Sequence, residues 1–245
     1  ATKQFVDSGK TIADLDNITY TDAGNTFSVD QTFNENVTVN GKVTTPNLSI
    51  DLITNDRDLV TKEYVEHSLI TNSNFQSILE ASLIIDPVIG GADPIHGPIS
   101  TWDVSLVTDM SNSFEDKTSF NGDISNWDVS GVTDMSNMFK NASTFNSDII
   151  SWDVCNVNSF EGMFNGAVSF NQDIGNWRTH NATNTRLMFR GANAFTIDIG
   201  NWDTSHVRDM HAMFSLADNF NSDISGWDVS IVTNFGRMFE QAIIF

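Results

Sequence analysis

A 25-residue repeat without insertions covers residues 99–245 and constrains the fold more than any other feature of the sequence. All six tryptophans of the chain lie on this repeat. Two phenylalanine columns and one isoleucine column keep the same step. The columns are Trp102, Trp127, Trp152, Trp177, Trp202 and Trp227; Phe114, Phe139, Phe164, Phe189, Phe214 and Phe239; Phe120, Phe145, Phe170, Phe195, Phe220 and Phe245; and Ile99, Ile124, Ile149, Ile174, Ile199 and Ile224. A fixed period of roughly 20 to 50 residues is typical of a solenoid or array.

The apolar pattern within one repeat predicts a coil with two unlike halves. In residues 121–145 the apolar positions from Val129 to Ala142 step by three and four, which predicts a helical turn or a chain of tight turns. Residues 123–127 are the most strand-like, so we expect one short strand per coil, stacked in parallel on the next at about 4.8 Å. Equivalent Trp and Phe rings should then lie on one another along the stack.

Composition excludes several classes of function. The chain of 245 residues is 40% hydrophobic, enough for a core, and its formal charge is −20. Acids outnumber bases both before and after residue 98, so we expect no nucleic-acid partner and no attraction to anionic membranes. No apolar run reaches about 18 residues, so we expect no membrane insertion, and Ala1–Gln4 is not a signal peptide. The single cysteine, Cys155, cannot form an intrachain disulfide, and we expect a small buried side chain rather than a reactive thiol.

Residues 1–85 have a different character. Thr2–Asp7 returns as Thr61–Glu66 in the same order of polar, basic, aromatic and acidic residues, and the segment between them alternates apolar and polar positions as short strands do. This segment offers little apolar material for a core of its own, so intertwining with identical chains would supply the missing contacts. Residues 74–85 are predicted to form a helix whose apolar end covers the first coil. Residues 86–98, rich in Pro and Gly, are predicted to be a linker and cap.

Three phrases in the N-terminal part resemble the shafts of viral and phage fibre proteins. They are Ala1–Asp7, Asn36–Val43 and Asp58–Val65. Such fibres are typically trimers, so the resemblance implies a homotrimer formed through residues 1–85. A generic β segment rich in Thr and Asn remains the alternative for these phrases.

The repeat itself is similar to that of BspA-like leucine-rich-repeat surface proteins. The pattern Phe-Asn-x-Asp-Ile-x-x-Trp-Asp-Val-x-x-Val-x-x-Met-x-x-Met-Phe carries the resemblance through all six copies. It implies a leucine-rich-repeat-like solenoid and adhesion or recognition at a surface, and it implies no enzyme. The predicted domains are therefore a fibre-like segment over 1–85, a linker and cap over 86–98, and six solenoid coils over 99–245.

Some copies depart from this pattern. The fourth reads Asn176–Ala182 with Arg178 in place of Asp, without either Val, and has Thr185 in the Met column. These changes indicate either a local irregularity or a specialised surface. The first copy has Ser113 and Lys117 at apolar positions, as suits a terminal coil. The last copy stops at Phe245 with no polar closing coil, so we expect either that the protein is longer than this sequence or that something covers that end.

No residue pattern indicates a catalytic, cofactor or metal site, and we predict none. Two aspartate columns invite a calcium interpretation, because hard cations bind clustered carboxylates; the other interpretation is that each Asp caps its own turn. The columns are Asp123, Asp148, Asp173, Asp198 and Asp223; and Asp103, Asp128, Asp153, Asp203 and Asp228. The histidines have no zinc-site spacing, and any acidic pair chosen for glycoside hydrolysis would be arbitrary.

These observations predict a structural and binding protein on a virion surface. Its repeat domain is expected to attach to a host-surface protein or glycan, or to another virion protein. Exposed pairs on the coils, which include Ser125/Asn126, Ile150/Ser151, Gly175/Asn176 and Gly200/Asn201, are candidates for a binding face. The alternative is a bacterial cell-surface or extracellular adhesin or lipoprotein. A more remote alternative is a glycan-degrading enzyme on a solenoid.

Overall fold

The computed structural model describes residues 18–19, 37–38 and 69–245, and the chain divides into two compact units, 1–69 and 70–245. In the first unit, strand β1 (Ile18–Thr19) pairs in parallel with β2 (Val37–Thr38), with Ile18 opposite Val37. β2 belongs to the stretch predicted to be rich in strands. The three fibre-like phrases lie otherwise outside the described residues, so the trimer and the shaft stay predictions.

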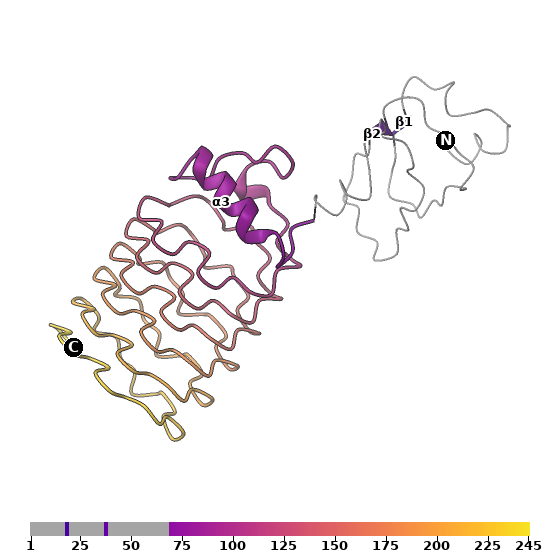
Figure 1. Cartoon of the computed structure of the whole chain (residues 1–245). Helices are drawn as coiled ribbons and strands as arrows, with labels where there is room; N and C mark the ends of the chain where they lie inside the picture. Colours follow the sequence, from indigo (N-terminus) through magenta and orange to yellow (C-terminus); the bar gives the residue numbers. More distant parts are fainter. Residues whose placement is uncertain (1–17, 20–36, 39–68) are drawn as a thin grey trace, which may run out of the picture. The chain divides into compact units, whose positions relative to one another are not determined.

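Residues 99–245 wind into stacked coils of 25 residues each (Figure 1). We number them coil 1 (99–123), coil 2 (124–148), coil 3 (149–173), coil 4 (174–198), coil 5 (199–223) and coil 6 (224–245). One residue of each coil forms a parallel bridge to its equivalent in the next. The bridged residues are Asp109, Asp134, Ser159, Asn184, Asp209 and Asn234. That these coils form a leucine-rich-repeat-like solenoid stays a prediction.

The two halves of each coil differ from the predicted strand and helix. After the short 3₁₀ helix η2 (Ile99–Thr101), residues 102–245 contain turns and single bridges but no helix and no longer strand. The bridge lies at Asp134 rather than within 123–127, because Asp123 and Asp128 each turn the chain there. Of the two structures predicted for the apolar half, helical turn or chain of tight turns, the chain of turns is formed.

Two positions of every coil adopt a left-handed backbone, which explains why this half does not become a helix. Asn137 and Asn141 have φ of 56° and 58°, and the equivalent residues of all coils are also positive. Overlapping turns close with i to i+3 hydrogen bonds, for example from Met138 N–H to Met135 C=O. A positive φ at the third residue is the signature of a type II turn, and right-handed helices do not accommodate it.

Aromatic rows fill the interior of the stack. Rings of the first phenylalanine column lie 5.3–5.7 Å from their equivalents in the next coil, nearly parallel. Rings of the second column lie 5.7–6.2 Å apart. Trp102 stacks on Trp127 at 6.2 Å and Trp177 on Trp202 at 6.5 Å. The expected ring stacking is therefore confirmed for these pairs, which are predominantly buried.

Each buried tryptophan also makes a polar bond to the coil before it. The indole N–H of Trp127 donates to the carbonyl of Ile99 at 2.9 Å, and Trp152 donates likewise to Ile124 at 3.2 Å. The same bond recurs through Trp227. Coil 1 has no preceding isoleucine, and Trp102 donates instead to Gly97 at 3.0 Å. The segment before coil 1 thus supplies the acceptor that a preceding coil would provide.

Helix α3 (Phe75–Ile85) closes the first coil (Figure 1, purple). Phe75, Leu79 and Leu83 are buried and share one helix face, and Phe75 meets Trp127 edge-on at 5.8 Å. The predicted helix is confirmed, but Ile84 and Ile85 are exposed, so the covering residues lie along the helix rather than at its end. Because this face packs on the coils, the boundary of the compact unit falls at 69/70 rather than at the predicted 85/86. None of the helices described here is long and apolar enough to cross a membrane.

Candidate functional site

Both aspartate columns cap turns of their own coil. Asp123 Oδ1 accepts from the backbone N–H of Ser125 at 3.0 Å and from its hydroxyl at 2.7 Å. The same bond from the backbone N–H of the residue two positions later occurs at all ten column residues: Asp103, Asp123, Asp128, Asp148, Asp153, Asp173, Asp198, Asp203, Asp223 and Asp228. The hydroxyl and backbone N–H of Ser125 lower the pKa of Asp123. The capping interpretation of the columns is confirmed.

A third capping column was missed in the sequence. Asp134 Oδ1 accepts from Ser136 N–H at 2.8 Å, and Asn184 Oδ1 accepts from Arg186 N–H at 3.0 Å. These are the bridged residues, so cap and bridge coincide at one position of the coil. The column is hidden because Asp, Ser and Asn alternate in it; the shared ability to accept a hydrogen bond is the signal that identifies it.

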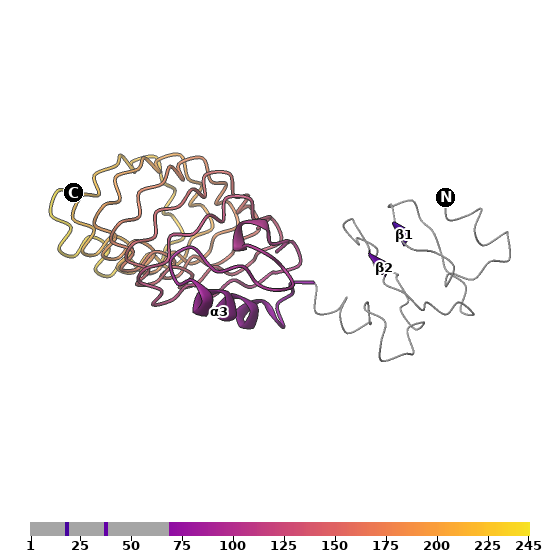
Figure 2. The ribbon, with the colours of Figure 1, turned by 90° about the horizontal axis from the view of Figure 1, so that it is seen from above.

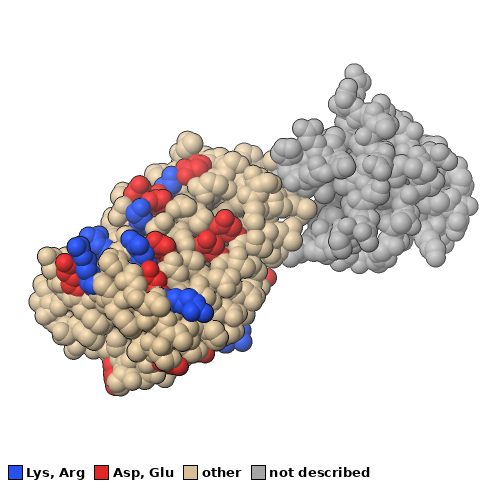
Figure 3. Space-filling model, turned by 60° about the horizontal axis from the view of Figure 1, so that its bottom comes forward, with Lys and Arg blue, Asp and Glu red and all other residues tan. Residues whose placement is uncertain are grey.

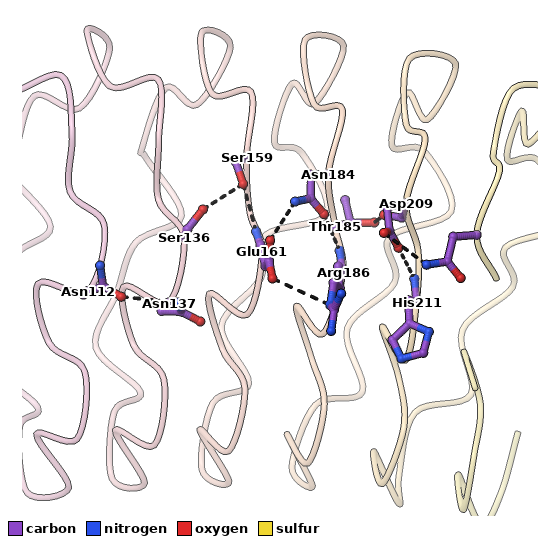
Figure 4. Close-up of polar contacts among 11 residues, drawn as sticks. Asn112, Ser136, Asn137, Ser159, Glu161, Asn184, Thr185, Arg186, Asp209 and His211 are labelled. Atoms are coloured by element: carbon purple, nitrogen blue, oxygen red, sulfur yellow. Dashed lines mark hydrogen bonds and ion pairs between the residues drawn. The ribbon is translucent and has the colours of Figure 1, made fainter. Parts of the chain in front are cut away.

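Polar side chains continue from this column into bonds between coils (Figure 4). The Ser136 and Ser159 hydroxyls lie 2.7 Å apart, and the Asn184 amide donates to Glu161 at 2.9 Å. Arg186 lies 3.7 Å from Glu161. These contacts tie coil to coil along one face. In the described part of the chain, no group of three or more His, Cys, Asp or Glu side chains is placed to hold a metal ion.

Cys155 is half-buried, so its predicted burial is wrong. Its position in the coil is that of Ser105, Ser130 and Ser205, beside rather than within the buried valine column. Hydrogen bonding to Asp153 raises the pKa of the thiol, with partial burial acting in the same direction. A raised pKa lowers the thiolate fraction, which agrees with the predicted lack of reactivity.

The fourth coil carries the most distinctive surface. A shallow hollow of about 290 Å³ is lined there by Gly175, Asn176, Trp177, Arg178, Thr179, His180, Asn201 and Asp203. Gly175, Asn176 and Asn201 belong to the pairs predicted to form a binding face; the other predicted pairs lie outside the hollow. Arg178, where the other coils have Asp, reaches back to Asp153 with an Nη2–Oδ2 distance of 2.8 Å.

The changes in the fourth coil preserve the stack beneath this surface. Thr179 replaces a buried valine, yet it is 4% exposed and its hydroxyl donates to the carbonyl of Asp203 at 3.0 Å. Thr185 replaces a methionine and bonds the Asp209 carbonyl in the same way at 3.3 Å. Each buried hydroxyl is therefore satisfied, which removes most of the cost of burying it. The coil changes its surface and keeps its place in the stack.

Charge also distinguishes the fourth coil. It holds Arg178, Arg186 and Arg190 against one acid, Asp198, so its formal charge is 3 − 1 = +2, whereas each of the other five coils is net negative. Arg178 and Arg186 pair with acids of coil 3, and the side chain of Arg190 is exposed with no ion pair to any described residue. Figure 3 shows that basic and acidic side chains lie side by side on one face of the unit 70–245. The fourth coil is a local basic segment in an acidic stack.

A profile of one protein family matches the same part of the chain. The family is DUF285, described as Mycoplasma protein of unknown function, and its profile matches residues 86–198 and, in an overlapping second match, 172–245. The two matches together cover the cap segment and all six coils, well over half of the chain. No curated protein and no solved structure matches.

Proposed function

The chain belongs to the DUF285 family, and on that premise we propose that it is a structural and binding protein whose coil stack presents a recognition surface. The stack engages a protein or glycan on a host surface or on a neighbouring particle. The fibre-like N-terminal segment joins three copies, so that several surfaces act together and gain in avidity. In this proposal no residue of the chain has a catalytic role.

The observation that carries the proposal is the departure of coil 4 from the repeat. Stacking alone requires each coil to resemble its neighbours, and five coils keep Asp where coil 4 has Arg178. The buried substitutions Thr179 and Thr185 are compensated by hydrogen bonds, whereas Arg178 and His180 line a hollow open to solvent. Arg178 also pairs with Asp153 of coil 3, and a ligand for the hollow accounts for the further placement of Arg178 and His180 beside solvent.

The chemistry of the hollow supports a polar ligand. Arg178 supplies a guanidinium, and Asn176 and Asn201 supply amides that both donate and accept. Asp203, on the adjacent coil 5, can accept hydrogen bonds, and hydrogen bonds from Ser205 already lower its pKa and keep it ionised. Such a mixture suits the hydroxyl and carbonyl groups of a glycan or of a peptide backbone. It offers only the largely buried edge of Trp177 as an apolar contact.

The location of the protein has two candidates, and each has its own support. The fibre-like phrases favour a virion surface. The description of the family names Mycoplasma proteins, which favours the second candidate, a bacterial cell-surface adhesin. Labelling of intact cells and of purified particles with an antibody against the coil stack would separate the two.

A glycan and cell-binding array with the full chain tests the recognition surface. We expect a ligand whose binding falls tenfold or more in the variant Arg178→Asp/His180→Ser, which restores the residues of the other coils. The matched control is Arg237→Asp, which makes the same charge change in coil 6 and should bind within about twofold of the unaltered chain. Equal losses in both variants, or no loss in the first, would remove coil 4 from the proposal. Light scattering on the full chain tests the trimer, and a strict monomer would remove the fibre-like part.

A further inference from the structure

Basic and titratable side chains gather around the hollow on coil 4 at positions where the repeat has other residues. Coils 4 and 5, which contribute them, are neighbours in the stack (Figures 1 and 2). Arg178 stands in a column that is otherwise Asp, and His206 stands in a column with Asn in the two preceding coils. His180 replaces a small side chain, because the other residues of its column are Ser105, Ser130, Cys155, Ser205 and Ser230. Three departures from the repeat therefore converge on one place.

Both imidazoles lie near the carboxylate of Asp203. His180 and Asp203 line the hollow together. The Ser205 hydroxyl donates to Asp203 Oδ1 at 2.6 Å and lies 3.2 Å from His206 Nδ1, so Ser205 links the carboxylate to the second imidazole. Hydrogen bonds from Ser205 lower the pKa of Asp203, and His206 and His180 act in the same direction. Asp203 therefore stays ionised over the range of about pH 5 to 8 in which histidine changes its charge.

The ion pair beside the hollow keeps its charges over the same range. The guanidinium of Arg178 is protonated at any pH at which the protein is folded, and it lies 2.8 Å from Asp153. The backbone N–H of Cys155 lowers the pKa of Asp153, and Arg178 adds to that effect. Neither partner of this pair therefore responds to mild acidification.

Three further carboxylates surround the hollow without lining it. Asp173, Asp198 and Asp228 each accept from the backbone N–H of the residue two positions later. Together with Asp153 and Asp203 they disfavour an anion at neutral pH. Between about pH 8 and pH 5 the groups here that change charge are the two histidines, and their protonation adds two positive charges around the hollow.

We propose that the hollow on coil 4 binds the carboxylate of an acidic saccharide and binds it more tightly under mildly acidic conditions. The inference rests on the recognition surface proposed for coil 4. The side chain of Arg178 is 65% exposed, and of its five donors only Nη2 bonds a described residue, Asp153, so the guanidinium can pair with a second carboxylate. The side chains of Asn176, Asn201 and Asp203 accept hydrogen bonds from sugar hydroxyls.

A saccharide fits the lining of the hollow better than an acidic peptide does. Trp177, the largest apolar residue of the lining, is 4% exposed, so the hollow offers little contact to an apolar side chain. A sugar acid combines one carboxylate, for Arg178 and protonated His180, with several hydroxyls that donate to Asp203 and to the amide oxygens. The carboxylate of a glutamate or aspartate side chain only accepts, so it brings no donor to these groups.

Calorimetric titration of the full chain tests the proposal. The probes are oligosaccharides of alternating glucuronic acid and N-acetylglucosamine, and oligogalacturonates, each compared with its carboxyl-reduced form. We expect an acidic probe to bind about tenfold more tightly at about pH 5.5 than at about pH 7.5, which is roughly the effect of two added unit charges about 6 Å away in a water-like dielectric. Binding at about pH 6.5 should take up protons, seen as a heat that depends on the ionisation enthalpy of the buffer.

Two variants locate the effect in the hollow. His180→Ser/His206→Asn restores residues that the same columns carry in other coils, so it should keep the melting temperature and lose both the pH dependence and the proton uptake. If its melting temperature falls, His180→Gln/His206→Gln takes its place. The matched control is His211→Ser, which removes a histidine that does not line the hollow and should leave both readouts unchanged.

Several results would overturn the inference. They are equal binding of an acidic probe and its reduced form, an affinity that does not change with pH, a pH dependence that persists in the histidine variant, binding of a glutamate-rich peptide instead of the acidic probes, and no binding of either acidic probe. The recognition surface on coil 4 would survive each of these results if the array yields a ligand whose binding is lost in Arg178→Asp/His180→Ser. It fails only if no such ligand is found, so the two failures are distinguishable.

Discussion

Truncating one ring in the middle of the stack should cost far more stability than truncating its equivalent at the end. Phe164 is fully buried and lies 5.7 Å from Phe139, 5.6 Å from Phe189 and 3.8 Å from Phe170. Replacing a buried phenylalanine by alanine costs roughly 3–5 kcal/mol. Aromatic pairs contribute roughly 0.5–1.5 kcal/mol each within that loss. We therefore expect Phe164→Ala to lower the free energy of unfolding by about 4 kcal/mol.

The matched variant is Phe239→Ala in coil 6. Phe239 is half-buried and has partners on one side only, Phe214 at 5.7 Å and Phe245 at 4.0 Å. Because no other described coil lies on its far side, about half of the contact is present in this chain, so we expect a loss of about 1–2 kcal/mol. The ratio between the two variants, rather than either value alone, reports the stacking.

Urea unfolding of the full chain, followed by the fluorescence of the tryptophans, measures both variants. Since each coil contacts only its neighbours, a defect in coil 3 should also lower cooperativity and separate the unfolding of the coils before it from that of the coils after it. Equal losses in Phe164→Ala and Phe239→Ala would refute the reasoning, and so would a loss below about 1 kcal/mol in Phe164→Ala.

Three further predictions concern the turns and the cap. Hydrogen bonds from Ser125 lower the pKa of Asp123, so the contribution of this carboxylate to stability is present above its unfolded pKa of about 3.9 and is lost as pH falls through the lower folded pKa. The urea midpoint, measured between pH 7 and pH 2, should therefore decline below about pH 4. The decline should be smaller in Asp123→Asn, whose amide oxygen still accepts a hydrogen bond but does not titrate. Gly166 has φ of 73°, and an added Cβ would lie 2.5 Å from Asn141 Oδ1, so Gly166→Ala should lower the free energy of unfolding by about 1–2 kcal/mol. Leu216 is at the equivalent position of coil 5 with φ of 61°, so Leu216→Gly should leave the free energy of unfolding unchanged or raise it by up to about 1 kcal/mol in the same urea assay. Leu79 is fully buried in α3, so Leu79→Ala should cost about 2–5 kcal/mol and speed the hydrogen exchange of coil 1 before that of coil 4; uniform exchange across the coils would contradict this role of α3 as a cap.

The ring stacking could be predicted from the sequence because it depends on side chains that the repeat keeps unchanged. Trp127 and Phe139 recur at every period and stack in the structure on Trp102 and Phe114. The backbone of the coil was harder to predict. Its left-handed positions are marked by Asn137 and Gly162 in two coils but are occupied by Leu187 in another, so residue type alone hides them.

The sequence indicated which coil carries the candidate site, but it did not indicate the contacts that form the site. The loss of Asp at Arg178 marked coil 4 as unusual, and the structure has a hollow there. The bonds by which Thr179 and Thr185 keep that coil in the stack depend on carbonyls of coil 5, which no local pattern reveals. Cys155 was predicted to be buried because it was assigned to the column of Val104, Val129 and Val229. The residue of that column is Val154, and a shift of one position is enough to move a side chain from the core to the surface.

The repetition of the same backbone bonds at every junction has a consequence for how such a protein changes its length. At each of the five junctions four backbone N–H groups of the earlier coil donate to four carbonyls of the later coil, as Phe139 N–H does to Met163 C=O. Duplication of an inner coil would therefore place a matched copy between two existing neighbours and leave the other junctions as they were. A gain or loss of residues that is not a multiple of 25 would shift the rings out of their rows. Recombination between repeats therefore lengthens the stack without disrupting its core, whereas an insertion within a repeat displaces the rings that form the core.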